Sequence, residues 1–196
     1  MPRTKKCEEF RPRNSLKTQL KKYIKNRDII SKYQSGFRIK HLCETTVNYV
    51  ISEWRAVGKD KRIIAIFFNF KRVFETIDRE IILNKLYMYG IRGIALDCFK
   101  SYMKRRRQTT KLNEIESNEI IRPQGSILEA LLFIIYINDM PSILKQCKLA
   151  LYADDTLIYT IANSDEEFHE NIKYDMKKID EWLKMNKLKL NEIKQK

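Results

Sequence analysis

Two adjacent carboxylates, Asp154 and Asp155, form the pair of side chains in this chain that most directly suggests chemistry. Apolar residues flank the pair within residues 148–159, in the pattern of two short strands joined by a tight turn. The simplest interpretation is an exposed acidic turn, because Asp is a common turn residue. With a third oxygen ligand nearby, however, the same pair would suit a hard cation such as Mg²⁺.

The elements that must position this turn follow from hydrophobic periodicity. The run 62–70 is almost continuously apolar and predicts a buried central strand, with Asn69 as a polar residue at its end. Asp78 has the residue type of a helix N-cap. Further helices are expected at 15–30, 41–57, 93–104, 126–138 and 165–186, a hairpin within 108–121, and a strand at 187–191.

The charge of the chain is +14 and is unevenly distributed. Residues 1–62 carry 17 Lys and Arg against 6 Asp and Glu, and residues 63–111 carry 11 against 4. Residues 112–196 carry 11 against 15, so the half that holds the two carboxylates is slightly acidic. A basic front half indicates a polyanionic partner such as a nucleic acid. A surface that is basic only for solubility remains an alternative.

The remaining composition bounds the class of protein. The cysteines are widely separated and the two histidines complete no zinc pattern, so the thiols indicate an ordinary reduced, intracellular protein. No signal peptide is recognisable after the N-terminal Met, and the most apolar run, 130–137, is too short to span a bilayer. We therefore expect an intracellular protein with no membrane partner, located in the nucleus or the cytoplasm.

Short segments between about Ile30 and Lys194 match the motifs of a known family in order and spacing. They are Gln34-Ser35-Gly36-Phe37-Arg38, Ile66-Phe67-Phe68-Asn69-Phe70-Lys71-Arg72-Val73-Phe74, Gly90-Ile91, Ser101-Tyr102 with Arg106 and Gln108, Pro123-Gln124-Gly125-Ser126-Ile127-Leu128 with Leu131-Leu132-Phe133, Tyr152-Ala153-Asp154-Asp155, and Leu188 to Lys194. On these motifs the chain resembles the reverse transcriptase domain of non-LTR (LINE-like) retrotransposons.

The resemblance implies an α/β fold of the α+β kind: a right-hand polymerase with fingers, and a palm whose antiparallel sheet is packed against helices. Residues 1–30 are expected to form a basic N-terminal arm and helix. Residues 31–196 are expected to form the fingers and palm, ending before the thumb, which is therefore expected to be absent.

The implied chemistry is two-metal nucleotidyl transfer to a primer 3′-hydroxyl, with Mg²⁺ or Mn²⁺ as cofactor. Asp154 and Asp155 match two of the family's three metal-binding carboxylates, and Asn69 stands where the family has the first Asp. An amide keeps an oxygen ligand but loses a negative charge and the ability to bridge two metals. The substitution predicts impaired catalysis. Glu129, where the family usually has Gly, is a second departure, expected to crowd or repel the incoming triphosphate.

The resemblance also assigns roles around the nucleotide. Phe74 matches the residue that stacks under the sugar and excludes a 2′-hydroxyl, and Lys194 matches a lysine that protonates the leaving pyrophosphate. The other matched nucleotide-binding positions are Arg38, Phe70, Gln124 and Gly125. Independently of the family, the run Arg105, Arg106 and Arg107 predicts a surface that contacts the nucleic-acid backbone.

Three functions compete at this stage. The first is an RNA-directed DNA polymerase that takes an RNA template, a DNA primer and deoxynucleoside triphosphates. The second is a catalytically inactive remnant that only binds nucleic acid. The third is an unrelated basic metal-binding domain with an accidental Asp-Asp turn, which the ordered motifs disfavour. Asn69 is the residue that discriminates the first from the second.

Overall fold

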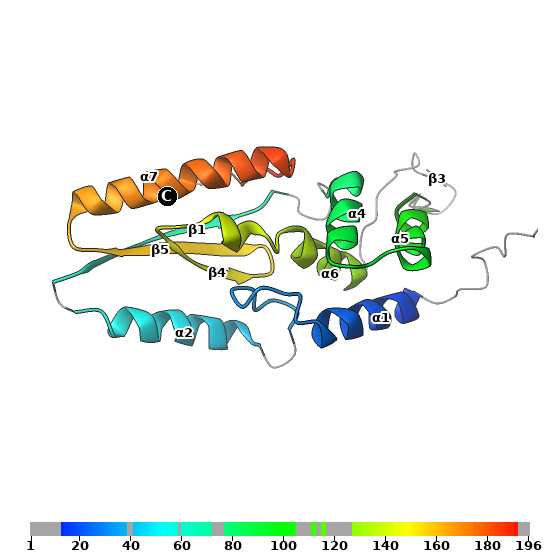
Figure 1. Ribbon diagram of the computed structural model, residues 1–196, viewed down its shortest axis with the longest axis horizontal. Helices are drawn as coiled ribbons and strands as arrows, with labels where there is room; N and C mark the ends of the chain where they lie inside the picture. Colours follow the sequence, from blue (N-terminus) through cyan, green and yellow to red (C-terminus); the bar gives the residue numbers. More distant parts are fainter. Residues whose placement is uncertain are drawn as a thin grey trace, which may run out of the picture.

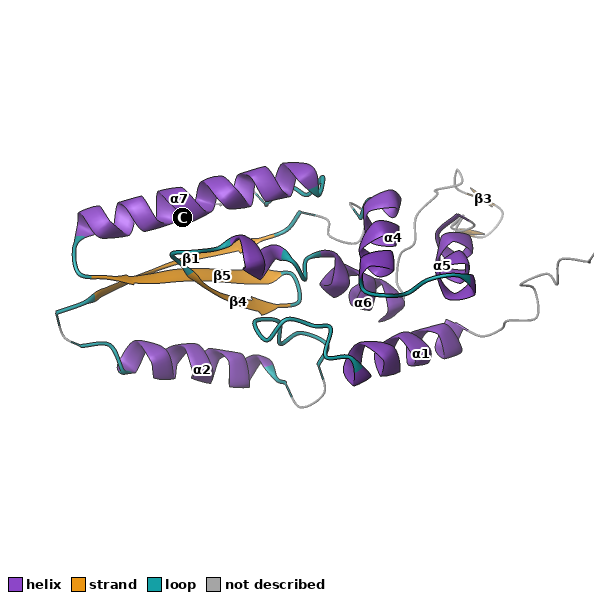
Figure 2. Cartoon of the chain, viewed as in Figure 1, coloured by secondary structure: helices purple, strands orange, loops and turns teal. Residues whose placement is uncertain are grey.

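A three-stranded antiparallel sheet lies between two helices, and a group of helices lies beyond one end of the sheet (Figure 1, Figure 2). The structure is a computed structural model that describes residues 13–38, 41–58, 60–71, 77–104, 111–112, 115–116 and 127–191. The mixed architecture with an antiparallel sheet confirms the predicted α+β class.

The sheet consists of β1 (Arg62–Asn69), β4 (Lys148–Tyr152) and β5 (Asp155–Ala162), in the order β1-β5-β4. The prediction of β1 as a central strand is therefore wrong: β5 is central and β1 lies at an edge. A run of apolar residues predicts burial of both strand faces, but it does not reveal whether a second strand pairs alongside. The predicted burial of the strand is also incomplete, because Phe67 in β1 is 67% exposed.

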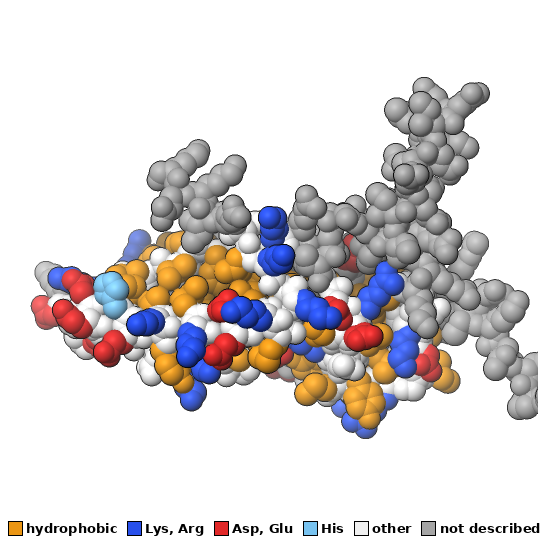
Figure 3. All heavy atoms as spheres, turned by 90° about the horizontal axis from the view of Figure 1, so that it is seen from above, with side chains coloured by type: hydrophobic (Ala, Val, Ile, Leu, Met, Phe, Trp, Pro, Cys, Tyr) orange, Lys and Arg blue, Asp and Glu red, His pale blue; other side chains and the backbone are white. Residues whose placement is uncertain are grey.

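Helix α7 (Asp165–Met185) packs along one face of the sheet (Figure 1). Ser164 caps the helix by accepting a hydrogen bond from the Glu167 N–H at 3.2 Å. The side facing the sheet buries Phe168, Ile179 and Trp182. The outer side carries basic and acidic side chains together, as Figure 3 shows, so it presents no surface of a single sign.

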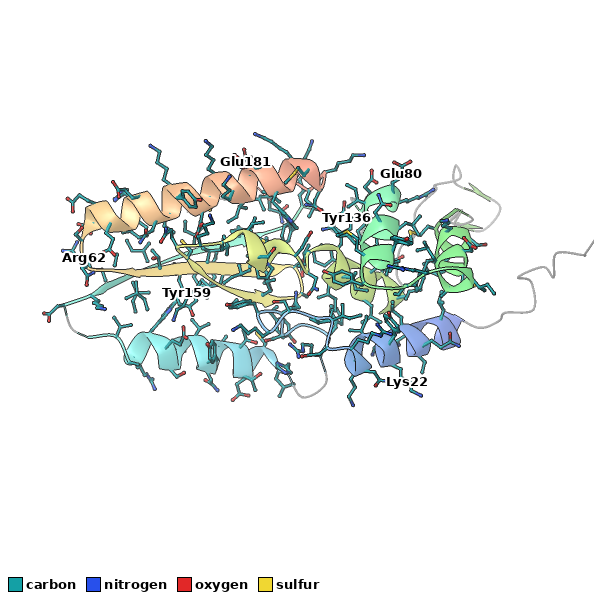
Figure 4. All side chains as sticks on the ribbon, in the orientation of Figure 1. Lys22, Arg62, Glu80, Tyr136, Tyr159 and Glu181 are labelled. Carbon is teal, nitrogen blue, oxygen red and sulfur yellow. The ribbon has the colours of Figure 1, made fainter. Side chains whose placement is uncertain are left out.

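Helix α2 (Cys43–Arg55) covers the opposite face. The Trp54 and Tyr159 rings meet edge to face with centroids 5.8 Å apart, and Tyr159 points from the sheet towards α2 (Figure 4). Glu53 accepts hydrogen bonds from the Tyr159 hydroxyl, from Tyr49 at 2.9 Å and from Lys148 at 3.1 Å. The Tyr159 hydrogen bond is the main cause that lowers the pKa of Glu53, whereas burial raises the pKa of Tyr159. These contacts fix α2 on the sheet.

The helical half contains α1 (Arg13–Asn26), α4 (Arg79–Met88), α5 (Ile94–Lys104) and α6 (Ile127–Tyr136), with the short helix η2 (Met140–Ile143) after α6. Helix α6 is apolar apart from Glu129, and each of its residues from Leu128 onward is buried. It therefore forms the centre of this half, against which α1 and α4 pack.

Most predicted elements lie where the sequence placed them. Asp78 caps α4 as predicted, accepting hydrogen bonds from the backbone of Glu80 at 3.0 Å and Ile81 at 3.1 Å. The predicted hairpin within 108–121 is a short pair, β2 (Lys111–Leu112) and β3 (Ile115–Glu116). The predicted strand at 187–191 is reduced to one antiparallel bridge, between Phe70 and Leu190. Within the described ranges, no helix combines the length and the apolar character needed to cross a membrane.

Candidate active site

The two strand ends that carry the predicted metal ligands lie side by side. Asn69 is the last residue of β1 and pairs directly with Asp155, which in turn pairs with Tyr152 of β4. Residues directly opposite one another in an antiparallel sheet point to the same face. Asn69, Asp155 and Tyr152 therefore form one row across all three strands. We call these three residues the ligand row.

The ligand row lines a pocket of about 590 Å³ between α2 and the sheet. Two positions further along the strands, the same face of the sheet carries an apolar row that also lines this pocket. It consists of Phe67, Leu157 and Ala150. Helix α2 supplies the opposite wall, chiefly Val47, Val50, Ile51 and Trp54. Two of the predicted ligands, Asn69 and Asp155, thus lie at the edge of a largely apolar pocket.

Asn69 is held through its backbone. The Asn69 carbonyl accepts from the Asn191 N–H at 2.8 Å, and the neighbouring Lys71 N–H donates to the Lys189 carbonyl at 2.8 Å. Asn69 Oδ1 is buried, and no described residue donates a hydrogen bond to it. A buried oxygen without a donor is costly in a native structure and is chemically suited to a cation.

The turn that carries Asp154 is strained. Strand β4 ends at Tyr152 and β5 begins at Asp155, so Ala153 and Asp154 alone form the connection. Ala153 has a φ of 56°, a conformation that residues with a Cβ rarely adopt. Asp154 lies in the turn, directly before Asp155 of the ligand row. Asp155 is exposed.

The donor set suits a hard divalent cation but is short of carboxylates. Asp154, Asp155 and Asn69 Oδ1 offer oxygen ligands only, as Mg²⁺ and Mn²⁺ prefer. Among the described residues, no group of three or more His, Cys, Asp or Glu side chains is placed to hold a metal ion. By residue type, two carboxylates and one amide are therefore the oxygen ligands that these three positions could offer to a cation.

Two predicted nucleotide-binding residues have other contacts in the structure. Phe70 is 1% exposed and packs edge to face on Phe133, and its carbonyl accepts from Asn191 Nδ2 at 3.4 Å. Arg38 lines a different pocket, of about 550 Å³, with Lys21, Lys22 and Lys25 of α1. The structure does not bring Arg38 into the pocket of the ligand row.

The remaining predicted site residues lie outside the described residues. These are Phe74, Gln124, Gly125 and Lys194, together with Arg105, Arg106 and Arg107. Their assigned roles remain predictions. Glu129, the second departure from the family, is 4% exposed in the first turn of α6. Its expected effect on a triphosphate is likewise a prediction.

Sequence reasoning missed two residues beside the site. Asn191 binds the end of β1, whereas the sequence predicts it only as part of a strand and of the Leu188–Lys194 motif. Gln34 is fully buried and contacts Ala153 in the strained turn through both polar atoms of its amide. Gln34 stood in a quoted motif, but its partner lies 119 residues away, and no local pattern connects the two.

The fold and the site together define a class: an antiparallel sheet packed against helices, with an Asp-Asp hairpin turn at the end of two strands, as in the palm of a polymerase. The sequence profile described as reverse transcriptase (RNA-dependent DNA polymerase) matches residues 3–196. The chain belongs to this family, and the predicted resemblance to retrotransposon reverse transcriptases is confirmed.

Individual relatives agree with this membership. The probable RNA-directed DNA polymerase from transposon BS of Drosophila melanogaster is 24% identical over 191 residues, which cover 88% of this chain and 20% of the relative. The chain thus spans about a fifth of that relative's length.

Two solved telomerase structures share the fold, each in complex with the TWJ fragment of telomeric RNA. Telomerase from Candida albicans superposes with a TM-score of 0.61 at 14% identity, over 92% of this chain and 34% of the other. Telomerase from Candida tropicalis superposes with a TM-score of 0.59 at 12% identity, over 91% of this chain and 32% of the other. At these identities the likeness shows the fold alone.

Proposed function

We propose that this chain is the fingers and palm of an RNA-directed DNA polymerase whose catalysis is impaired at the metal site. Its substrates would be an RNA template, a DNA primer and deoxynucleoside triphosphates. The observation that carries the proposal is the direct pairing of Asn69 with Asp155 at the Asp-Asp turn. This pairing sets two of the family's three ligand positions opposite each other, with Asp154 next to them in the sequence, and one of the three positions is uncharged.

The reaction joins the primer 3′-oxygen to the α-phosphorus of the nucleotide. The hydroxyl proton is lost, the new P–O bond forms, and the bond from the α-phosphorus to the pyrophosphate oxygen breaks. Bound Mg²⁺ would supply charge neutralisation for the attacking and leaving oxygens. In this chain Asp154, Asp155 and Asn69 Oδ1 would hold the cation, and the apolar pocket beside them would limit the access of water.

Impairment follows from charge. Two carboxylates bring two negative charges to the site, whereas the family's set brings three. Each ~1.4 kcal/mol of lost transition-state stabilisation lowers the rate about tenfold, and the lost carboxylate is expected to remove several such steps. Asp78 does not compensate, because it caps α4 beyond the end of β1, where it binds Lys187 at 2.6 Å.

The alternative is an inactive remnant that only binds nucleic acid. The basic residues 1–111 favour binding under either function. The neutral Asn69 favours the alternative. Both functions predict binding of nucleic acid, and only the polymerase predicts turnover of nucleotides.

Primer extension on an RNA template tests the proposal. We would compare the wild type, Asn69→Asp, and the double variant Asn69→Asp/Asp155→Asn, with Mg²⁺ and with Mn²⁺. The expected result is little extension by the wild type, a gain of at least about tenfold in Asn69→Asp, and loss of that gain in the double variant. Glu129→Gly is added to the Asn69→Asp background, because Glu129 is the second departure from the family. Binding without extension in every variant supports the alternative, and robust wild-type extension contradicts the proposed impairment.

The cellular setting belongs to the same proposal. Among the described residues, Cys43, Cys98 and Cys147 form no disulfide, in keeping with a reducing compartment. Burial raises the pKa of the Cys147 thiol to about 12, which keeps it protonated and unreactive. We place the activity in the nucleus or the cytoplasm, where templates and nucleotides are available.

A further inference from the structure

The Ala153–Asp154 turn is contacted by a segment far away in the sequence. Residues 33–35 run beside β4, on the edge opposite β5. The Leu151 N–H donates to the Tyr33 carbonyl at 2.9 Å, and the Ser35 N–H donates to the Leu151 carbonyl at 2.9 Å. This parallel bridge between Gln34 and Leu151 leads the chain directly to the turn.

Gln34 then uses its amide to bind the backbone of Ala153. The Ala153 N–H donates to Gln34 Oε1 at 3.0 Å, and Gln34 Nε2 donates to the Ala153 carbonyl at 3.3 Å. The Gly36 N–H donates to the same Oε1 at 2.7 Å. Gln34 is 0% exposed, so water cannot replace these bonds. The side chain thus holds both backbone groups of the one residue in the turn that has a strained φ.

Gly36 adds a steric requirement at the same residue. A Cβ at Gly36 would lie 2.3 Å from the Ala153 nitrogen and 2.8 Å from its Cα, which are backbone atoms that cannot turn aside. It would also lie 2.9 Å from Gln34 Oε1. Any larger residue at this position would push the turn away from Gln34.

The segment that carries Gln34 is itself anchored. Arg38 donates to the carbonyls of Ser31 at 3.2 Å and Gln34 at 3.4 Å. Asn138, just after α6, accepts from the Ser31 N–H at 2.7 Å and donates to the Ile29 carbonyl at 2.8 Å. A continuous set of hydrogen bonds therefore connects the end of α6 to the Asp-Asp turn.

We propose that Gln34 and Gly36 are positioning residues that fix the Ala153–Asp154 turn, and through it the carboxylates of Asp154 and Asp155, in the geometry required to bind a divalent cation. The consequence for metal binding rests on the proposed function. The consequence for the turn rests on the contacts alone. Groups that orient metal ligands typically change metal affinity 10–100-fold when they are removed.

Two variants remove the contacts from different residues. Gln34→Met keeps the length of the side chain and removes both polar atoms, and Gly36→Ala introduces the clash with Ala153. Each has a matched control within the chain. The control for Gln34→Met is Thr160→Val, which replaces another buried polar side chain, towards the far end of β5. The control for Gly36→Ala is Gly58→Ala, because a Cβ at Gly58 meets nothing within 4 Å.

The first measurement is amide hydrogen exchange in the metal-free, full-length chain, followed by NMR. We expect the Ala153 amide to exchange about tenfold faster in Gln34→Met and in Gly36→Ala, because its acceptor is lost or displaced, with Tyr159 unchanged within about twofold. The controls Thr160→Val and Gly58→Ala should leave Ala153 unchanged. Unchanged exchange at Ala153 would overturn the proposal, because Gln34 and Gly36 would then not restrain the turn. An equal increase at Tyr159 would also overturn it, because the variants would then destabilise the whole sheet.

The second measurement is Mn²⁺ titration in the Asn69→Asp background, read from paramagnetic broadening of the Asp154 and Asp155 amides. Gln34→Met is expected to weaken Mn²⁺ binding at least about tenfold while the affinity for a primer–template duplex stays the same. Equal loss of both affinities would show a merely structural role and contradict the proposal. If the Asn69→Asp reference binds no Mn²⁺, the proposed function fails, and the exchange result alone then decides the role of Gln34.

Discussion

Asn69 combines two opposing effects at a single position. A carboxylate there would stand directly opposite Asp155 in the sheet, and like charges in that arrangement repel. The amide removes this repulsion and so stabilises the metal-free fold. It also removes the charge that would attract a cation. The residue therefore favours stability over metal binding, a common exchange at functional sites.

This exchange predicts how Asn69→Asp changes stability. In metal-free buffer the variant should unfold with a free energy lower by about 1 kcal/mol, because two carboxylates then face each other. Mg²⁺ at about 100 times its dissociation constant should raise the free energy of unfolding of the variant by about 2.7 kcal/mol. Thermal unfolding with EDTA and with Mg²⁺ measures both effects. Asn69→Asp/Asp155→Asn is the control, since it should lose the repulsion and most of the Mg²⁺ response; a wild type stabilised equally by Mg²⁺ would contradict the prediction.

At the scale of elements, local patterns predicted most helices and the Asp-Asp hairpin, because caps and periodicity are properties of adjacent residues. Asp78 at the start of α4 is an example. The same patterns failed for the position of β1, because an apolar run carries no information on how many strands lie beside it. They also failed for Gln34, whose buried amide is explained only by Ala153, 119 residues later. What sequence reasoning missed in the site is thus its long-range polar contacts.

The cap of α4 predicts a pH dependence of stability. The pKa of the Asp78 carboxyl is lowered below its ordinary value, chiefly by the Lys187 ammonium 2.6 Å away. The backbone N–H groups of Glu80 and Ile81 lower it further. Because the folded pKa is the lower one, the stabilisation is present above the unfolded pKa of about 3.9 and is lost as pH falls through the folded value.

Two variants separate the cap from its charge. Asp78→Ala should lower the free energy of unfolding at pH 7 by about 1 kcal/mol. Asp78→Asn should keep much of the cap while flattening the acid limb of the pH profile, because Asn caps well and does not titrate. Urea unfolding from pH 7 to pH 3 measures both. An Asp78→Asn profile that is as steep as that of the wild type would rule out this carboxyl as the titrating group.

At the scale of the whole molecule, charge separates the two halves of the chain. Helix α1 carries Lys17, Lys21, Lys22 and Lys25 with no acidic residue, and Lys22 points into solvent (Figure 4). Helix α7 mixes both signs along its outer side (Figure 3) and has three acidic residues in its first turn. A polyanion is therefore expected to bind along α1 and its neighbours and to avoid α7.

This asymmetry predicts a difference in salt dependence. Replacing Lys21, Lys22 and Lys25 by Gln should weaken RNA binding for all sequences and reduce the log–log salt slope by about 2, at about 0.7 per single-strand phosphate contact. Replacing Lys173, Lys177 and Lys184 of α7 by Gln makes the same change in net charge and serves as the control. Fluorescence anisotropy from 50 to 300 mM salt, on the order of the physiological range, gives the slopes. Equal slopes for the two triple variants would show that binding does not follow the asymmetry.

The sheet order also has a consequence for how the chain folds during synthesis. The ribosome completes β1 at residue 69, but its pairing strand, β5, begins only at residue 155. At about 5–20 residues per second, β1 waits several seconds or more without a partner, and an unpaired apolar strand is prone to aggregate. The strand that ends in Asn69 is thus made early and paired late, so the nascent chain is exposed to misassembly until both sides of the site have left the ribosome.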